Sequence, residues 1–206
     1  RRERFDISLD FSLEHRYSLI SKLAGIRRRI GFNYKNRGRF LTDSQDLAGY
    51  QDKHAVEYCL GLLEPLGIKA NTLGLELFIN PQAQSKEELI FKDLRISGKE
   101  LLIGISPGAG VSWGENAVYK HWPAERFAQV VDKFSKDSGA RILLLGDERE
   151  NHLAQRIIKA VSARPLDLTG KTTLRELAAI IARLNLLVAN DGGPLHMAVA
   201  LGVKTV

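Results

Sequence analysis

From residue 100 onward, short apolar runs alternate with longer segments of helical periodicity. The apolar runs are ELLIGI (100–105), RILLLG (141–146), PLDL (165–168), NLLVAN (185–190) and KTV (204–206). Apolar residues at helical spacing fill the segments between them (123–139, 148–161, 172–184 and 194–202). Thr173 and Glu176 form the pattern of a capping box, which marks a helix start. Apolar strands that alternate with helices form parallel sheets covered on both faces, so this half is predicted to be a Rossmann-like α/β layer.

The first half is less regular. Its predicted elements are a strand at Phe5–Phe11, a helix at Glu14–Ala24, a strand at Arg29–Phe32, a loop from Asn33 to Tyr50, a helix at Asp52–Leu66, a strand at Leu75–Ile79 and a helix at Lys86–Leu94. The polar, proline-bearing stretch NPQAQSKEE (80–88) is predicted to be the linker between domains. We therefore expect two α/β domains, residues 1–96 and 97–206. Because a predicted strand stands at each end of the chain, we also expect further elements on both sides.

Composition narrows the class of protein. Hydrophobic residues make up 44% of the 206 residues and charged residues 26%, as in globular domains. Cys59 is the single cysteine, which excludes an internal disulfide and a multi-cysteine metal site. The formal charge is +6, and a basic cluster between residues 27 and 39 favours either an anionic partner or ordinary solvated surface. Its members are Arg27, Arg28, Arg29, Lys35, Arg37 and Arg39.

The loops that follow the apolar runs carry the candidate chemistry. They contain SPGAGVSWGENAVYKHWP (106–123), GDERE (146–150), TGKTT (169–173) and NDGG (190–193). In an open parallel sheet, ligands bind at the carboxyl ends of the strands, in the loops that lead into helices. Turn chemistry alone does not explain polar, phosphate-compatible or ribose-compatible groups in every one of these loops. We expect the loops to meet at one edge of the sheet.

The stretch NDGGPLH is suited to an anion. The first N–H groups of a helix have no partner inside it, and the helix dipole places about half a positive charge there. Gly192 and Gly193 allow close approach to the backbone, and Pro194 fits the first turn. His196 could reach a phosphate oxygen, and Lys120 could add a full charge. Each residue also has a structural interpretation: Asp191 as a helix cap, the glycines as a turn, His196 as a core histidine and Lys120 as surface.

Several specific motifs fail. The loop SPGAG lacks the G-x-G-x-x-G pattern because position 113 is Trp, and TGKTT lacks the first glycine of a P-loop because position 165 is Pro. Asp191 and His196 alone are too few to define a metal site, so no metal is expected. The sequence carries no recognised nucleic-acid motif, and its basic residues are not interleaved with aromatic ones, so no nucleic-acid partner is expected.

Taken in order, these segments resemble glycosyltransferase family nine, the bacterial ADP-heptose:lipopolysaccharide heptosyltransferases. The resemblance rests on SPGAG, KHWPAERFAQVV, ILLLGDERE and DLTGKTTLRELAAIIARLNLLVANDGGPLHMAVALG, and in the first half on FDISLDFSLEHRYSLISKLAGIRRRIGF. It covers nearly the whole chain. Its most specific part is D-x-G-P-x-H-x-A-x-A-L-G, placed behind a K-x-W-P element and a G-K-T-x-L-x-E-L element.

The resemblance implies two Rossmann-like domains in the glycosyltransferase-B architecture, with the acceptor on residues 1–96 and the sugar nucleotide on residues 97–206. It implies transfer of heptose from ADP-heptose to the inner core of lipopolysaccharide, with inversion, without a metal and without a cofactor. Such an enzyme would be cytoplasmic and peripheral at the inner face of the bacterial inner membrane.

By position, the resemblance also implies roles for individual residues. Asp191, Gly192, Gly193 and His196 would hold the pyrophosphate and sugar. Lys120 would pair with the phosphates or sugar, Glu150 would bind the ribose, and Thr172 would contact the adenine through its backbone. Lys120 and Asp191 are the expected catalytic residues. The family's general base would lie ahead of Arg1. A longer loop replaces the hydroxyl pair that some members place before K-x-W-P, and Ser112 is a candidate there.

Two alternatives stay open from the residues alone. One keeps the fold and changes the chemistry, as in an epimerase or a transferase with another sugar-nucleotide donor. The other is a nucleotide-binding module without catalysis.

Overall fold

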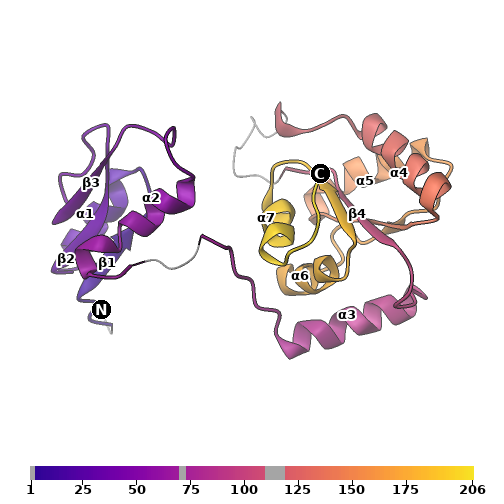
Figure 1. Cartoon of the computed structure of the whole chain (residues 1–206), viewed down its shortest axis with the longest axis horizontal. Helices are drawn as coiled ribbons and strands as arrows, with labels where there is room; N and C mark the ends of the chain where they lie inside the picture. Colours follow the sequence, from indigo (N-terminus) through magenta and orange to yellow (C-terminus); the bar gives the residue numbers. More distant parts are fainter. Residues whose placement is uncertain (1–2, 70–72, 110–118) are drawn as a thin grey trace. The chain divides into compact units, whose positions relative to one another are not determined.

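The computed structural model describes residues 3–69, 73–109 and 119–206. The chain forms two compact units, Arg1–Gly74 and Leu75–Val206. Both contain a parallel sheet with helices (Figure 1). The α/β class predicted from the alternating pattern is therefore confirmed. The units divide between Gly74 and Leu75, ahead of the boundary expected between residues 96 and 97.

The second unit contains a four-stranded parallel sheet in the order β6-β5-β4-β7. Its strands are β4 (Leu102–Ser106), β5 (Arg141–Leu144), β6 (Leu166–Asp167) and β7 (Leu186–Ala189), and its helices are α3 (Pro81–Asp93), α4 (Ala124–Ser138), η3 (Glu148–Glu150), α5 (Asn151–Ala160), α6 (Leu174–Ala182) and α7 (Gly193–Ala200). The four strands predicted between residues 100 and 190 are present. The terminal KTV also pairs, since Leu187 forms a parallel bridge with Thr205.

Alternate strand residues pack on opposite faces of this sheet. Ile103, Ile105 and Leu144 pack with α4 and α5, in a cluster that includes the fully buried Val131. Leu143 and Leu187 point to the other face, against α6 and residues of α3 and α7. Figure 1 shows α4 and α5 on one side of β4 and α6 and α7 on the other. This burial of both sheet faces is the reason that the strands are apolar throughout.

Helix α3 corrects two predictions for the segment 75–88. Residues 73–80 have no regular secondary structure, so the strand predicted at Leu75–Ile79 is wrong. The linker predicted at 80–88 is wrong as well, because α3 already begins at Pro81. Asn80 caps this helix by accepting a hydrogen bond from the Ala83 N–H at 2.8 Å. An Asn followed by Pro is a helix-start signal, and here it outweighs the polar composition of the segment.

The first unit contains a three-stranded parallel sheet in the order β1-β2-β3. Its elements are β1 (Ile7–Asp10), α1 (His15–Leu23), β2 (Arg28–Tyr34), β3 (Asp43–Leu47), α2 (Ala55–Gly61) and η1 (Glu64–Leu66). The strand, helix and strand predicted up to Phe32 are confirmed, and β2 runs two residues further. The helix predicted at Asp52–Leu66 is split into α2 and η1. The buried core of the first unit consists of Ile30, Phe32, Leu47 and Leu62.

Strand β3 lies inside the segment predicted as a loop, so that prediction is wrong. Its sequence, DSQDL, has four polar residues, and Leu47 is its one buried residue. The strand forms by pairing with β2, from Ile30 opposite Asp43 to Tyr34 opposite Leu47. In the described sheet β3 is an edge strand, because it pairs with β2 on one side only. An edge strand needs little apolar surface, so the pattern of apolar and polar residues does not reveal it.

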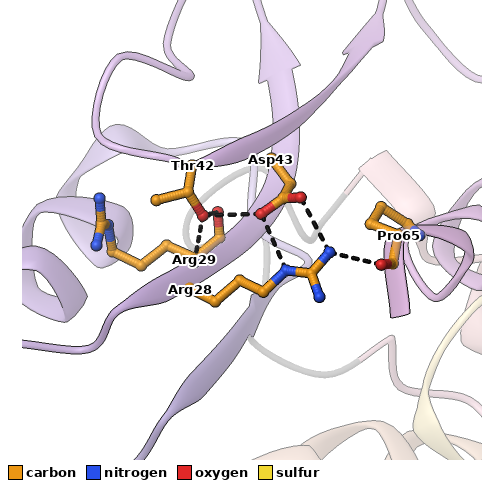
Figure 2. A network of polar contacts seen from close by, with 5 residues as sticks. All are labelled: Arg28, Arg29, Thr42, Asp43 and Pro65. Carbon is orange, nitrogen blue, oxygen red and sulfur yellow. Dashed lines mark hydrogen bonds and ion pairs between the residues drawn. The ribbon is translucent and has the colours of Figure 1, made fainter. Parts of the chain in front are cut away.

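Part of the basic cluster holds the first unit together (Figure 2). Arg28 donates to both carboxylate oxygens of Asp43, at 3.3 Å and 3.1 Å, and to the Pro65 carbonyl at 2.5 Å. The hydrogen bond from Arg28 holds the pKa of Asp43 below its usual range. The Thr42 hydroxyl also donates to Asp43, at 2.8 Å, and accepts from the Arg29 N–H at 2.8 Å. Arg28 thus joins β2, β3 and η1, which is a structural role.

Candidate functional site

The order of the second sheet creates a crevice between β4 and β7. These strands are neighbours, paired from Ile103 opposite Leu186 to Ser106 opposite Ala189. Helix α4, which follows β4, packs on one face, whereas residues of α7, which follows β7, pack on the other. When the chain continues from two adjacent strands to opposite faces of the sheet, a crevice forms between the two loops. Ligands of open α/β sheets bind in this crevice.

Asn190 joins the tips of both strands. Its side-chain Nδ2 donates to the Pro107 carbonyl at 2.6 Å, just after β4. Its Oδ1 accepts from the Trp122 N–H at 3.2 Å, just before α4. Trp122 is in turn anchored edge-on against Phe127 with a centroid distance of 5.0 Å. The amide therefore holds the segment carrying Lys120 against the end of β7.

Three predicted site residues meet at this point. Lys120 Nζ forms an ion pair with Asp191 Oδ2, and His196 Nε2 lies 3.8 Å from Asp191 Oδ1. The hydrogen bond from Lys120 and its positive charge hold the pKa of Asp191 below its usual range. Asp191 is therefore ionised at neutral pH, and it keeps a cation at the rim of the crevice. Its side chain is 61% exposed, so a ligand can reach the pair.

The start of α7 lies beside this pair. Gly192 is the N-cap residue and has no side chain to offer the first N–H groups of the helix. A Cβ built on Gly193 would meet no heavy atom within 4 Å, so this backbone borders open space. Pro194 occupies the first turn. This helix end can accept an anion through backbone N–H groups and the helix dipole.

A pocket of about 400 Å³ extends from the crevice along the strand ends. Its lining comes from all four strand-end loops: Ser106 and Gly108, then Gly146, Asp147, Arg149 and Glu150, then Thr172, Leu174 and Leu177, then Gly193 and Pro194. The expectation that these loops meet at one edge of the sheet is confirmed. The volume falls in the range of small-molecule sites, about 300–1,000 Å³.

Glu150 and Thr172 both line this pocket. Glu150 Oε2 accepts the Asp147 N–H at 3.1 Å, and Asp147 caps the same turn. Thr172 precedes the capping residue Thr173 of α6, whose hydroxyl accepts the Glu176 N–H at 3.3 Å. The capping box predicted for this helix is confirmed. The ribose and adenine roles of Glu150 and Thr172 remain predictions.

Two polar features at the rim were not predicted from the sequence. One is Asn190, whose signal was an amide standing directly after a buried strand. The other is the pair formed by Arg149 and Asp147, in which Nε and Nη2 donate to Oδ2 at 3.1 Å and 2.5 Å. The hydrogen bond from Arg149 lowers the pKa of Asp147. Ser112 lies outside the described residues.

Within residues 3–69, 73–109 and 119–206, no three His, Cys, Asp or Glu side chains gather as metal ligands would. In those same ranges, no helix combines the length and apolar character needed to cross a bilayer.

The model of glycosyltransferase family 9 (heptosyltransferase) matches residues 1–206. This chain belongs to glycosyltransferase family 9. Among curated relatives, it is 27% identical to lipopolysaccharide heptosyltransferase 2 of Salmonella typhimurium, over 98% of this chain and 58% of that protein. It is 32% identical to lipooligosaccharide heptosyltransferase 2 of Campylobacter jejuni, over 84% of this chain and 50% of that protein. The chain thus spans half or slightly more of the length of these relatives.

Solved structures agree with this family 9 membership. The chain superposes on the family 9 glycosyl transferase from Veillonella parvula with a TM-score of 0.84 and 27% identity, covering 99% of this chain and 57% of that one. It also matches the fold of Escherichia coli heptosyltransferase WaaC with ADP, with a TM-score of 0.65 and 19% identity, covering 98% of this chain and 61% of that one.

Proposed function

We propose that the protein transfers heptose from ADP-heptose to the inner core of lipopolysaccharide. Two relatives are named heptosyltransferases of lipopolysaccharide or lipooligosaccharide, and a structure with the same fold is described with ADP. The observation that carries the proposal is the pocket where four strand-end loops meet beside Lys120, Asp191 and the start of α7. In this proposal the second unit binds the donor, the first binds the acceptor, and both belong to a glycosyltransferase-B architecture.

The donor would lie along the strand ends. The nucleoside would occupy the pocket with its ribose at Glu150 and its adenine at the Thr172 backbone. The diphosphate would reach Gly192 and Gly193 at the start of α7. Lys120 would then exchange its contact with Asp191 for a phosphate oxygen, and Asp191 and His196 would be left to hold the sugar. Since Lys120 already stands at the rim, this exchange needs a side-chain movement only.

The reaction follows from this arrangement. An acceptor hydroxyl attacks the anomeric carbon from the face opposite ADP, the bond to the diphosphate oxygen breaks, and the configuration inverts. Negative charge grows on the departing ADP, where backbone N–H groups, the helix dipole and Lys120 stabilise it. These groups supply positive potential without a divalent ion, so the reaction is proposed to need no metal. The general base would be an acidic residue ahead of Arg1, which takes the hydroxyl proton.

The acceptor chemistry places the reaction at a membrane surface. Inner-core lipopolysaccharide is anionic and membrane-borne, so the enzyme would act at the cytoplasmic face of the inner membrane as a peripheral protein. In the basic cluster, Arg37 pairs with Glu14 at 3.0 Å and Arg28 pairs with Asp43, so these two cations already have partners. The remaining cluster would attract the acceptor, an attraction that added salt should weaken.

Nucleotide selectivity tests the donor assignment. Titration calorimetry of the chain with ADP, UDP, GDP and CDP should give binding with ADP and weaker binding with the other three. Lys120→Ala should weaken ADP binding, while Lys133→Ala, which removes a surface lysine paired with Asp137, should not. Preference for another base would favour a transferase or epimerase with a different donor.

Transfer itself is tested with the full-length protein, ADP-heptose and a heptose-deficient lipopolysaccharide, by mass spectrometry of the product. Addition of one heptose is expected. ADP binding without transfer would favour the non-catalytic nucleotide-binding module.

A further inference from the structure

The carboxylate of Glu150 lies against two glycines that follow neighbouring strands. A Cβ built on Gly108, after β4, would lie 1.8 Å from Oε1 and 2.0 Å from Cδ of Glu150. A Cβ built on Gly146, after β5, would lie 2.7 Å from Oε2 of the same side chain. Non-bonded atoms do not approach this closely, so Glu150 can take this position only because Gly108 and Gly146 lack a side chain.

Backbone conformation does not explain these two glycines. Among the residues that the structure describes, the glycines with positive φ are Gly25, Gly67, Gly139, Gly170 and Gly202, and neither Gly108 nor Gly146 is among them. An alanine could therefore adopt either backbone without strain. What the two positions require is space, and the atoms that need this space are those of the Glu150 carboxylate.

The same carboxylate is held from its own turn. Glu150 Oε2 accepts the Asp147 N–H at 3.1 Å, in a capping box that opens η3. Glu150, Gly108 and Gly146 all line the pocket of about 400 Å³. The capping bond and the two glycines together place the carboxylate at the strand ends, inside the pocket.

We propose that Gly108 and Gly146 are positioning residues that create a slot for the Glu150 carboxylate and so make the site selective for a ribonucleotide. The inference rests on the proposed function, in which Glu150 faces the ribose. A carboxylate accepts hydrogen bonds from ribose hydroxyls, as acidic residues do in dinucleotide-binding folds. A site built to bond a hydroxyl rejects the analogue that lacks it, because the polar group of the site is then left unpaired.

The test compares ADP with 2′-deoxy-ADP by titration calorimetry of the full chain. Wild-type protein should bind ADP about tenfold or more tightly than 2′-deoxy-ADP, as expected for a hydrogen bond to a charged group. Gly108→Ala and Gly146→Ala should each displace the carboxylate and bring the two affinities close together. The obstacle in each case is the end of a flexible side chain, so the fold should persist, as far-ultraviolet circular dichroism can check.

Two further variants separate positioning from a general effect of adding a methyl group. Gly98→Ala is the matched control, since its Cβ would make ordinary contact with Arg183 at 3.7 Å, and it should keep the wild-type preference. In a Glu150→Ala background the preference should already be lost, and Gly108→Ala should change it no further.

The outcomes distinguish the two proposals. If the wild-type chain binds no ADP, the donor assignment and this inference both fall. If ADP binds normally and Gly108→Ala keeps the full preference over 2′-deoxy-ADP, this inference alone is overturned. An effect of Gly108→Ala that is equally large in the Glu150→Ala background would also overturn it, because the methyl group would then act on something other than Glu150.

Discussion

The strongest test of the packing of the second unit is Arg183→Ala. Arg183 extends from the end of α6 to the carboxylate of Glu87 on α3, with Nη1 at 3.2 Å and 3.4 Å from the two oxygens. The Glu87 side chain is only 2% exposed, whereas that of Arg183 is 44% exposed. Burial raises the pKa of Glu87, and the charge of Arg183 opposes that rise. Removing the arginine therefore leaves a carboxylate in a buried position without this counter-charge.

The size of the effect has an upper limit, because Glu87 can take up a proton. Protonating a carboxyl with an ordinary pKa near 4.3 costs about 1.36 kcal/mol for each pH unit above it, or about 3.7 kcal/mol at pH 7 and about 1 kcal/mol at pH 5. A folded-state pKa above the unfolded value gives stability that is complete below the unfolded pKa and is lost as pH rises through the folded pKa. Arg183→Ala raises that folded pKa further, so its cost grows from pH 5 to pH 7.

Urea denaturation measures this cost. Trp122 belongs to the second unit and packs edge-on against Phe127, so its fluorescence follows the unfolding of this unit. We expect Arg183→Ala to lower the free energy of unfolding by about 2–3 kcal/mol at pH 7 and by about 1 kcal/mol at pH 5. Loss of the contact between Arg183 and the Phe91 ring adds a small decrease that does not depend on pH. The control is Arg156→Ala, which breaks an exposed pair with Glu125 on the same unit and should change little. Equal losses at the two pH values would refute the reasoning.

Three further outcomes are expected. Lys120→Ala should slow heptose transfer 10²–10³-fold, about 3–4 kcal/mol in the barrier, with unchanged thermal stability; a wild-type rate would exclude its assigned role. Excess EDTA should leave the rate of transfer unchanged, and a loss restored by Mg²⁺ would contradict the metal-independent mechanism. Thr173→Ala removes the hydroxyl that accepts the Glu176 N–H and should cost about 1 kcal/mol in urea denaturation, whereas Thr173→Ser should retain most of the stability.

Much of the second unit could be predicted because its strands are buried on both faces. Such strands must be apolar throughout, and RILLLG and NLLVAN therefore stand out from the helices beside them. The opposite case is LELFI (75–79), which is apolar enough for a strand but is not part of either described sheet. Strand β3 is polar and forms through its pairing with β2. A pattern along the chain does not contain these partners, since they depend on which segments become neighbours.

The candidate site divides in a similar way. The convergence of four loops follows from a general rule for parallel sheets, so it could be predicted without knowing a single contact. The bonds of Asn190 and the proximity of Gly108 to Glu150 could not, because they depend on side-chain directions across three loops. The order of residues along the chain identified the charged groups of the site. Only the structure identified the residues that hold these groups in place.

The double role of the Asn190 amide has a consequence for the thermodynamics of binding. With its Oδ1 and Nδ2 each engaged by a different segment, the tips after β4 and β7 and the backbone at Trp122 are ordered in the free protein. The entropy of arranging them is lost during folding and is not lost a second time when a ligand arrives. Association at this rim should therefore carry a smaller entropic penalty than closure of an unanchored loop would impose.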